Sequence, residues 1–243
     1  MHRLRAIIKL PLCLATACLL AIACNRTESG ATASLETTLL LYEEQEQGTD
    51  SYPVRILVNR DFVRFDDGYD ASDYVLFDRR SRAIFSVAHA ERSILVIDHL
   101  PVVAPLPADI RLAVQRSRDD EAPAIGGRQP VHMQFMANDT ICLEAVVVPG
   151  LLVDVSTALA EYADALGARQ LKTLQSVPAE MQTACFLVRY VYLPGQQLRA
   201  GLPIREWDAA GYWRRLRDFR ENEAVAAGLF ELPRGYAEIR IRQ

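Results

Sequence analysis

Few side chains in this sequence lie at spacings that would bind a metal. Beyond the first 23 residues the histidines are His89, His99 and His132, and none belongs to a His-x-x-x-His or His-Glu-x-x-His pattern. We therefore expect structural or solvent-facing roles for all three, with zinc binding as the alternative.

Four aspartates form a second group with metal-binding chemistry. Asp66, Asp67, Asp70 and Asp73 surround Gly68, and clustered carboxylates can bind calcium. Their spacing is not that of an EF-hand loop, and Asp-Gly is above all a turn signal. We therefore predict a turn here and no metal site.

The sequence contains no familiar catalytic motif. It has no Gly-x-Ser-x-Gly elbow, no Ser-x-x-Lys pair and no phosphate-binding loop, and its acidic residues are too scattered to name an acid and a base. We therefore predict no catalytic residue, no cofactor and no enzymatic activity. The minor alternative is a hydrolase whose site is assembled from distant residues.

The first 23 residues predict secretion. Arg3, Arg5 and Lys9 precede a short apolar run that ends in small residues, which is the pattern of a signal peptide. The run is shorter than the roughly 20 apolar residues of a transmembrane helix. Residues 24–34 are small, polar and turn-rich and are expected to form a flexible tether, which leaves 35–243 as a single periplasmic domain.

Cys24 directly follows Ala21-Ile22-Ala23, and this makes the leader resemble a bacterial lipoprotein signal. The resemblance implies that Cys24 is lipidated, for example with palmitate, and that the chain is anchored to a membrane. Cys18 is a rival processing point, and secretion without a lipid is the alternative. Because Asn25 rather than aspartate follows the cysteine, the lipoprotein pattern favours the periplasmic face of the outer membrane over the inner membrane or the soluble periplasm.

Two cysteines remain for the folded domain. Cys142 and Cys185 form an even pair in an oxidising compartment, so we predict a disulfide between them. Two separate buried thiols are the alternative. The absence of a Cys-x-x-Cys spacing argues against a redox pair.

Charge argues against one class of partner. The leader holds three of the 27 basic residues and none of the 31 acidic ones, so the mature chain would carry a net charge near −7 rather than −4. Proteins that bind nucleic acid show a concentrated basic face. We therefore expect no nucleic-acid partner.

The hydrophobic pattern predicts an antiparallel sheet. From residue 35 to about 98, short β-branched and aromatic runs recur between turn residues, which is typical of a meander with one face toward water. Residues 116–129 are expected to form an exposed loop. The expected strands cover 37–42, 53–58, 62–65, 74–77, 83–87, 93–97, 109–114, 131–136, 140–147 and 237–241.

The later part of the chain predicts helices. Residues 155–166 have helical spacing, with Asp154 or Ser156 as the N-cap. Residues 178–193 fit a helix capped by Ser176, although their composition also fits a strand.

Residues 202–216 favour a hairpin, although 212–219 would also line a helix. The interleaved aromatic and arginine residues of 212–220 are expected to form a solvated amphipathic face. Contact with lipid headgroups or an acidic partner is the alternative.

Strand order, late helices and the phrases Asp73-Tyr74-Val75-Leu76-Phe77-Asp78 and Leu232-Pro233-Arg234-Gly235-Tyr236 resemble the half-barrel family that includes LolA and LolB, together with related proteobacterial lipoproteins. The resemblance covers roughly residues 35–243. It implies an α+β fold in which about two helices pack on one face of a curved antiparallel meander. No binding residue of the family can be carried over.

Three functions follow from this interpretation. The first is a membrane-anchored lipoprotein that binds a lipid or other hydrophobic ligand, favoured by a large cavity lined by Phe65, Phe77 and Phe85. The second is an envelope interaction module without a small ligand, favoured by a packed sheet–helix interface. The third is a hydrolase, favoured by a histidine, a carboxylate and a hydroxyl within hydrogen-bond reach.

The lipidation of Cys24 has a direct test. Cys24→Ser is expected to abolish incorporation of labelled palmitate and to move the chain from the membrane fraction to the soluble fraction, because the acyl chain is the predicted anchor. Metabolic labelling and fractionation of the bacterial envelope measure both effects. Palmitate in the Cys24→Ser variant would contradict the assignment.

Overall fold

A computed structural model describes residues 34–118 and 122–241. The predicted leader 1–23, the lipidation site Cys24 and tether residues 25–33 lie outside the described residues. Ser34, the last residue of the predicted tether, already belongs to the first strand. Among the described residues no helix is both long enough and apolar enough to cross a membrane.

In the described residues nine strands come first, a helical segment follows, and three further strands close the chain. The strands are β1 (Ser34–Gln45), β2 (Tyr52–Val58), β3 (Phe62–Asp66), β4 (Tyr74–Asp78), β5 (Ala83–Ala88), β6 (Ser93–Ile97), β7 (Leu112–Arg118), β8 (Val131–Ala137), β9 (Thr140–Val148), β10 (Leu202–Trp207), β11 (Trp213–Ala226) and β12 (Ala237–Arg240). The helical segments are α1 (Val153–Thr173), η1 (Leu174–Ser176), η2 (Ala179–Met181), α2 (Ala184–Phe186), η3 (Leu187–Tyr192) and η4 (Ala227–Phe230).

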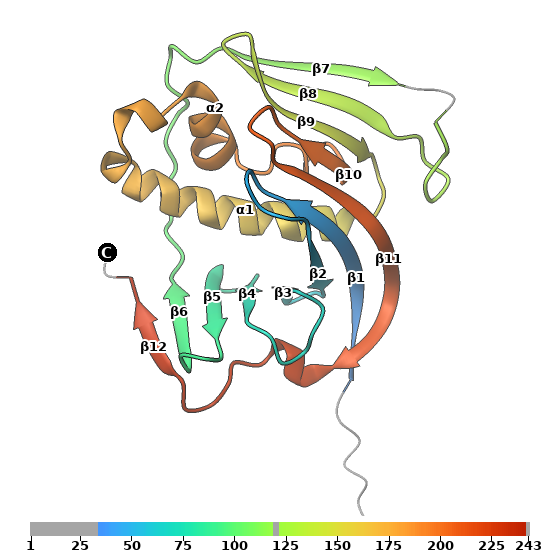
Figure 1. Cartoon of the computed structure of the whole chain (residues 1–243), viewed down its shortest axis with the longest axis vertical. Coiled ribbons are helices and arrows are strands. Elements are labelled where there is room, and N and C mark those ends of the chain that lie inside the picture. Colours follow the sequence, from blue (N-terminus) through green and yellow to red (C-terminus); the bar gives the residue numbers. More distant parts are fainter. Residues whose placement is uncertain (1–33, 119–121, 242–243) are drawn as a thin grey trace, which may run out of the picture. The chain divides into compact units, whose positions relative to one another are not determined.

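Within the described ranges the strands form one open sheet in the order β12-β6-β5-β4-β3-β2-β1-β11-β10-β9-β8-β7 (Figure 1). The predicted α+β class is confirmed. Every neighbouring pair is antiparallel except β12 and β6, which are parallel, so the antiparallel prediction is wrong for the last strand. The chain between β11 and β12 packs across one face of the sheet before β12 joins its edge.

The long strands β1 and β11 join two meanders into this sheet. β1 to β6 form the first meander and β7 to β9 the second, and β11 pairs with both β1 and β10. The pairing of β1 with β11 contains two register shifts, and such bulges bend and twist a strand pair. Figure 1 shows both strands as long curved ribbons on the right of the view.

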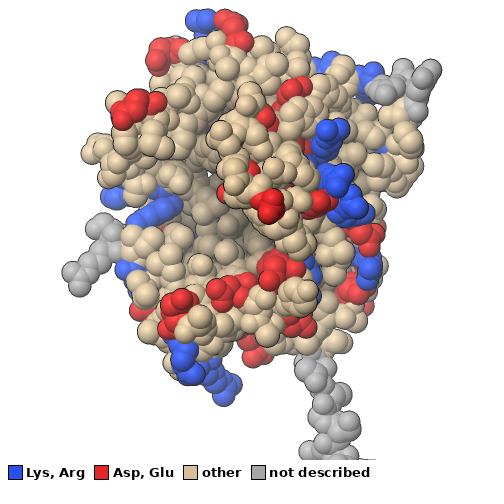
Figure 2. Space-filling model, in the orientation of Figure 1, with Lys and Arg blue, Asp and Glu red and all other residues tan. Residues whose placement is uncertain are grey.

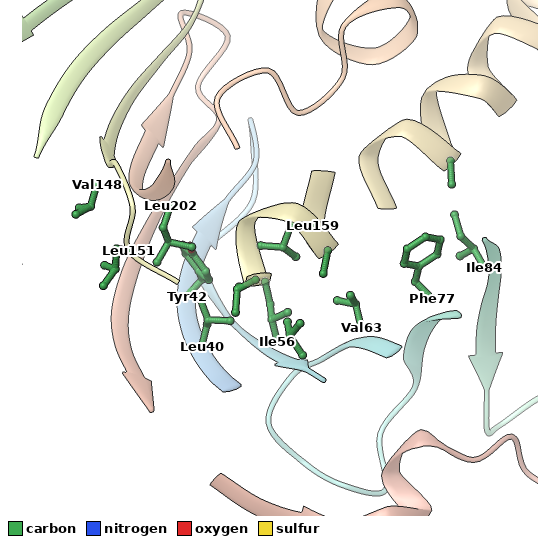
Figure 3. Close-up of a cluster of buried hydrophobic side chains, with 14 residues drawn as sticks. Leu40, Tyr42, Ile56, Val63, Phe77, Ile84, Val148, Leu151, Leu159 and Leu202 are labelled. Atoms are coloured by element: carbon green, nitrogen blue, oxygen red, sulfur yellow. The ribbon is translucent and has the colours of Figure 1, made fainter. Parts of the chain in front are cut away.

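Helix α1 fills the inner face of the first meander (Figure 3). Tyr162 of α1 lies with its ring centroid 4.6 Å from that of Phe65 and 5.7 Å from that of Phe77. At Gly167 a Cβ atom would come within 2.6 Å of Pro194 Cγ, so this glycine lets the segment after η3 approach the helix closely. The sheet–helix interface is therefore packed.

The outer face of the first meander is also buried, so the expectation of one solvent-facing side is wrong there. Leu57 is fully buried, although it packs on the opposite face of the sheet from its neighbours Ile56 and Val58. The cover is the chain after β11, which brings Phe230 against this face. Phe85 packs in this second cluster, and Phe65 and Phe77 pack in the first, so the three rings do not line one cavity.

Several local predictions need correction. Helix α1 begins after Leu152, which has φ 45° and no side-chain cap, so neither Asp154 nor Ser156 is the N-cap. β7 extends to Arg118 and takes the start of the predicted 116–129 loop. Residues 184–192 are helical, as favoured, but their N-cap is Thr183, whose hydroxyl accepts from the Phe186 N–H at 3.2 Å, and not Ser176.

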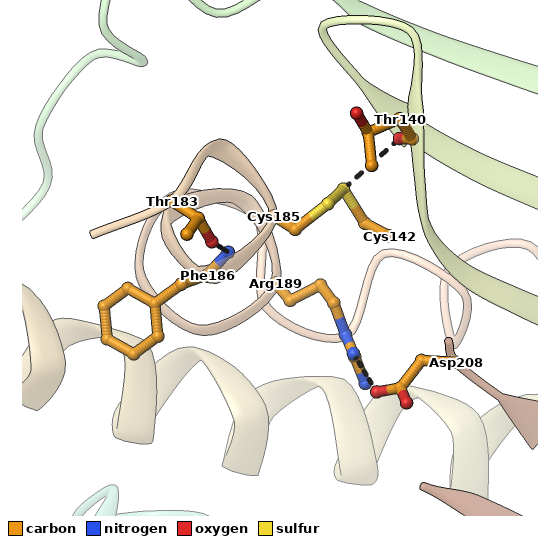
Figure 4. The surroundings of a disulfide bond; sticks show 7 residues. All are labelled: Thr140, Cys142, Thr183, Cys185, Phe186, Arg189 and Asp208. Atoms are coloured by element: carbon orange, nitrogen blue, oxygen red, sulfur yellow. Dashed lines mark hydrogen bonds and ion pairs between the residues drawn. A yellow bond between two sulfur atoms is a disulfide. The ribbon is translucent and has the colours of Figure 1, made fainter. Parts of the chain in front are cut away.

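The predicted disulfide between Cys142 and Cys185 is present (Figure 4). It joins β9 to α2 with a Cα–Cα distance of 5.0 Å. Cys142 and Val188 share a small buried cluster with Ile110. The bond therefore fixes the short helical segment against the second meander.

Removing this disulfide is expected to destabilise the fold. The bridge spans a sequence separation of 43, for which loop-closure entropy predicts a loss of about 4 kcal/mol in the Cys142→Ala/Cys185→Ala variant. Urea denaturation of wild type, reduced wild type and variant measures the loss. The reduced wild type and the variant should show the same free energy of unfolding. A loss below about 1 kcal/mol relative to the oxidised wild type would contradict the expectation.

Candidate functional site

A row of three charged side chains crosses the centre of the sheet. The register places Glu44 of β1 opposite Arg214 of β11, and Arg214 opposite Glu206 of β10. Arg214 Nε lies 3.0 Å from Glu206 Oε2 and 3.7 Å from Glu44 Oε1. The three residues therefore form one electrostatic unit, called here the central charged row.

The central charged row is largely removed from solvent. The side chain of Glu206 is 3% exposed and that of Arg214 is 18% exposed, and the guanidinium carbon lies 4.0 Å above the Tyr42 ring. Burial raises the pKa of the Glu44 carboxyl, against the opposing charge of Arg214. Burial also disfavours the charge on Arg214, but the combined attraction of Glu206, Glu44 and the neighbouring tyrosines outweighs it and holds the pKa of Arg214 above its ordinary value.

The hydrogen-bonding capacity of Arg214 is not used up within the described residues. Its Nε lies 3.0 Å from Glu206 Oε2 as an ion pair, but neither Nε nor Nη2 has a hydrogen-bond partner there. Buried donors without an acceptor cost free energy. An acceptor brought by a bound molecule would remove that cost.

A pocket of about 450 Å³ lies against this row. Its size is within the ~300–1,000 Å³ typical of small-molecule sites. Both apolar and polar side chains line the pocket. The lining residues are Glu46, Leu143, Ala163, Leu166, Gln170, Arg189, Tyr190, Leu193, Pro194, Gly195, Gln196, Gln197, Leu198, Glu206, Tyr212 and Arg214.

A second ion pair borders the pocket. Arg189 of η3 contacts Asp208, which also accepts from the backbone N–H groups of Ala210 and Tyr212 in the turn between β10 and β11 (Figure 4). Arg189 lies with its guanidinium carbon 5.8 Å from the Tyr212 ring centroid. The pair ties η3, which follows the disulfide, to the hairpin that carries the charged row.

Charge is unevenly distributed over the surface (Figure 2). The view shows a hollow near its centre with acidic side chains at the edges, and basic side chains along the side where β11 runs. On β11 these exposed arginines are Arg215, Arg217 and Arg220, and each has a carboxylate within 4 Å, as in the 2.6 Å contact of Arg215 with Glu43. This part of 212–220 is the solvated face expected from the sequence.

The four aspartates, for which the sequence predicts a turn and no metal site, bind protein groups. Asp66 accepts from Arg55 Nε at 2.7 Å and Arg64 Nε at 2.6 Å, and Asp70 accepts from Arg55 at 2.8 Å. Asp67 accepts from Ser72 and Asp73 from the backbone of His89. No group of three or more metal-ligating side chains suited to a metal ion occurs in the part of the chain that the structure describes.

The three histidines lie in different parts of the structure, His89 in the turn after β5, His99 after β6 and His132 on β8. His89 Nδ1 lies 2.8 Å from the Tyr236 hydroxyl, and His99 lines a separate surface hollow. His132 Nε2 lies 3.0 Å from Glu144 Oε2. The histidines therefore do not meet in a common site, and among the described residues His132 is the one whose ring contacts a carboxylate.

The sequence interpretation missed the central charged row. Once 212–216 is taken as a strand, period-two spacing places Arg214 on the same side as Tyr212 and Leu216, which points it inward. In β10 the same alternation places Glu206 on the face opposite that of its neighbours Arg205 and Trp207. The composition of 212–219 fits both a helix and a strand, and the strand is the one that places Arg214 beside Tyr212 and Leu216.

Comparison with known proteins gives little beyond these observations. No family model and no curated protein sequence matches the chain. One similar solved structure is PNGF-II, at a TM-score of 0.42 and 12% identity over 85% of this chain and 31% of that one, so the chain spans about a third of PNGF-II. Another is an uncharacterized conserved protein from Thermus thermophilus, at a TM-score of 0.41 and 10% identity over 85% of this chain and 91% of that one. Neither likeness bears on function.

The ion pairs of Asp66 predict a pH-dependent loss of stability. Asp66→Asn is expected to cost about 3 kcal/mol at pH 7, because it leaves the 2%-exposed side chain of Arg64 without its carboxylate. Burial opposes ionisation of Asp66, but hydrogen bonds from Arg55 and Arg64 hold its pKa below the ordinary value. The stabilisation is therefore present above the unfolded pKa, about 3.9, and is lost as the pH falls through the lower folded value.

Urea denaturation at pH 7 and pH 3 tests this expectation. The difference in the free energy of unfolding between wild type and Asp66→Asn should be smaller at pH 3 than at pH 7. Asp70→Asn, at a carboxylate 66% exposed, is the matched control and should cost below about 1 kcal/mol. Equal losses in the two variants would contradict the account.

Proposed function

We propose that this chain is a lipoprotein anchored through Cys24 to the periplasmic face of the outer membrane, and that it binds an amphipathic ligand in the pocket beside the central charged row. The leader pattern of residues 1–24 supports the anchor. The observation that carries the binding function is the pocket itself, since it joins apolar walls to a buried arginine with unused donors.

The chemistry of the lining favours a ligand with two parts. Leu143, Leu166 and Leu198 would contact an apolar body such as an acyl chain. Arg214 and Tyr212 would contact a polar head. This combination is typical of small-molecule sites, in which a few polar groups orient a largely apolar ligand.

The charges beside the pocket restrict the head group. Glu44 and Glu206 both face the single guanidinium of Arg214, and Glu46 adds a further carboxyl to the lining. Coulomb repulsion from these groups disfavours a bare carboxylate. The proposed ligand is therefore a single-chain amphiphile with a neutral or zwitterionic head.

The proposal keeps the half-barrel resemblance but places the ligand in a different position from the one that the resemblance implies. In the LolA/LolB-like arrangement implied by the sequence, a ligand would lie between the sheet and its helices. Here Tyr162 packs on Phe65 and Phe77 in that place. The proposed ligand instead lies beside α1, between this helix, the segment 189–198 and β10–β11.

An envelope interaction module without a small ligand is the second candidate. The packed interface between α1 and the first meander favours it, because a filled core needs no ligand for its stability. In that case the pocket would be a surface irregularity and would not respond to lipids.

Native mass spectrometry of the full chain in detergent micelles tests the binding function. Lysophosphatidylethanolamine, a zwitterionic single-chain lipid, is the probe, and palmitate is the anionic comparison. Gln170→Trp should weaken binding of the probe at least about tenfold, because the indole would fill the pocket beside α1.

Lys172→Trp is the matched control, since both residues are exposed on α1 and Lys172 does not line the pocket. It should leave binding unchanged. A wild-type chain that stays bare after the challenge would favour the interaction module. Equal losses in the two variants would place binding elsewhere.

A further inference from the structure

A histidine, a carboxylate and a hydroxyl meet on the face of the second meander that points away from its buried side chains. Ser117 of β7 lies opposite His132 of β8 in the sheet register, and Ser117 Oγ is 3.4 Å from His132 Nδ1. His132 Nε2 is 3.0 Å from Glu144 Oε2 on β9. Three neighbouring strands thus place the three groups in a row across the sheet.

Two further side chains hold Glu144 in place. Its Oε1 accepts from Trp207 Nε1 at 3.0 Å, and its Oε2 accepts from Gln134 Nε2 at 3.0 Å. The hydrogen bond from Gln134 and those from Trp207 and His132 lower the pKa of Glu144 against the effect of burial. The carboxylate is therefore ionised at neutral pH and fixed in position.

The orientation of His132 follows from these contacts. An ionised carboxylate accepts but cannot donate, so the Nε2 atom that faces Glu144 must carry the proton. Nδ1 of the neutral ring is then left as an acceptor toward the Ser117 hydroxyl. The Trp207 ring stacks on the imidazole at 5.5 Å between centroids and 5° between planes, which restricts rotation of the ring.

The array is accessible to a substrate. Ser117 is exposed, and the side chain of His132 is 35% exposed. β7 is the last strand of the sheet among the described residues. Edge strands present unpaired backbone N–H groups, which are donors of the kind that stabilise a developing oxyanion.

We propose that Ser117 and His132 form a hydrolytic site for carboxylic esters, with Glu144 as the positioning residue. Ser117 Oγ attacks the ester carbonyl carbon while His132 Nδ1 takes the hydroxyl proton. The C–O bond to the alcohol then breaks, the alcohol leaves with that proton, and an acyl group remains on Ser117. Water attacks the acyl carbon, again giving a proton to His132, and the carboxylic acid is released as Ser117 regains its hydrogen.

The proposal is independent of the pocket beside the central charged row. It corresponds to the minor hydrolase alternative, for which the sequence showed no motif. The strands that supply the three residues are neighbours in the sheet, and the sequence contains no Gly-x-Ser-x-Gly pattern.

Fluorophosphonate labelling of the full chain tests the site. The serine oxygen displaces fluoride from the probe, and peptide mass spectrometry locates the adduct. We expect an adduct on Ser117 and its loss in Ser117→Ala. His132→Gln should slow labelling at least about 100-fold, the lower range for loss of a general base. Hydrolysis of p-nitrophenyl butyrate should fall in parallel.

Two controls separate activation from folding. Ser51→Ala removes an exposed serine that donates to Glu43 Oε1 at 3.1 Å but has no imidazole partner in the described residues, and it should leave labelling unchanged. Glu144→Gln should slow labelling, and Glu144→Asp should restore part of the rate. Thermal denaturation confirms that each variant is folded. An unlabelled Ser117 in the wild type, or labelling that does not depend on His132, would overturn the proposal.

Discussion

The pairing of β1 with β11 is the constraint on which the rest of the structure depends. Without it the two meanders would be separate sheets, because β11 is the strand that pairs with both β1 and β10. The pairing is long and contains two register shifts, and such bulges bend and twist a strand pair. It also brings Glu44, Arg214 and Glu206 to one level of the sheet.

That alignment places charge where the chain would otherwise bury apolar surface. A buried ion pair contributes little net stability, because desolvation offsets much of its attraction. Arg214 keeps two nitrogens without a hydrogen-bond partner in the described residues, so the row is an incompletely satisfied polar site that lines a pocket. The disulfide and the contact of Arg189 with Asp208 fix segments that border this pocket, and these features together favour a bound molecule over a purely structural role.

Much of the sheet could be predicted from the sequence, because alternating apolar residues and turn signals are local. The disulfide followed from counting cysteines once the leader was set aside. Three features could not be read locally. The cover over Leu57 comes from Phe230, a contact far apart in the chain. The parallel β12 depends on the same crossing segment. The array of Ser117, His132 and Glu144 depends on strand register, which no motif encodes.

Hydrogen exchange of the full chain with and without lysophosphatidylethanolamine tests the central claim most directly, because it locates the binding surface without any substitution. The account predicts added protection in 163–170, 189–198 and 204–214, the segments that form the pocket beside the central charged row. The β7–β8 hairpin should exchange as before. No added protection, or protection confined to other parts of the sheet, would contradict the account.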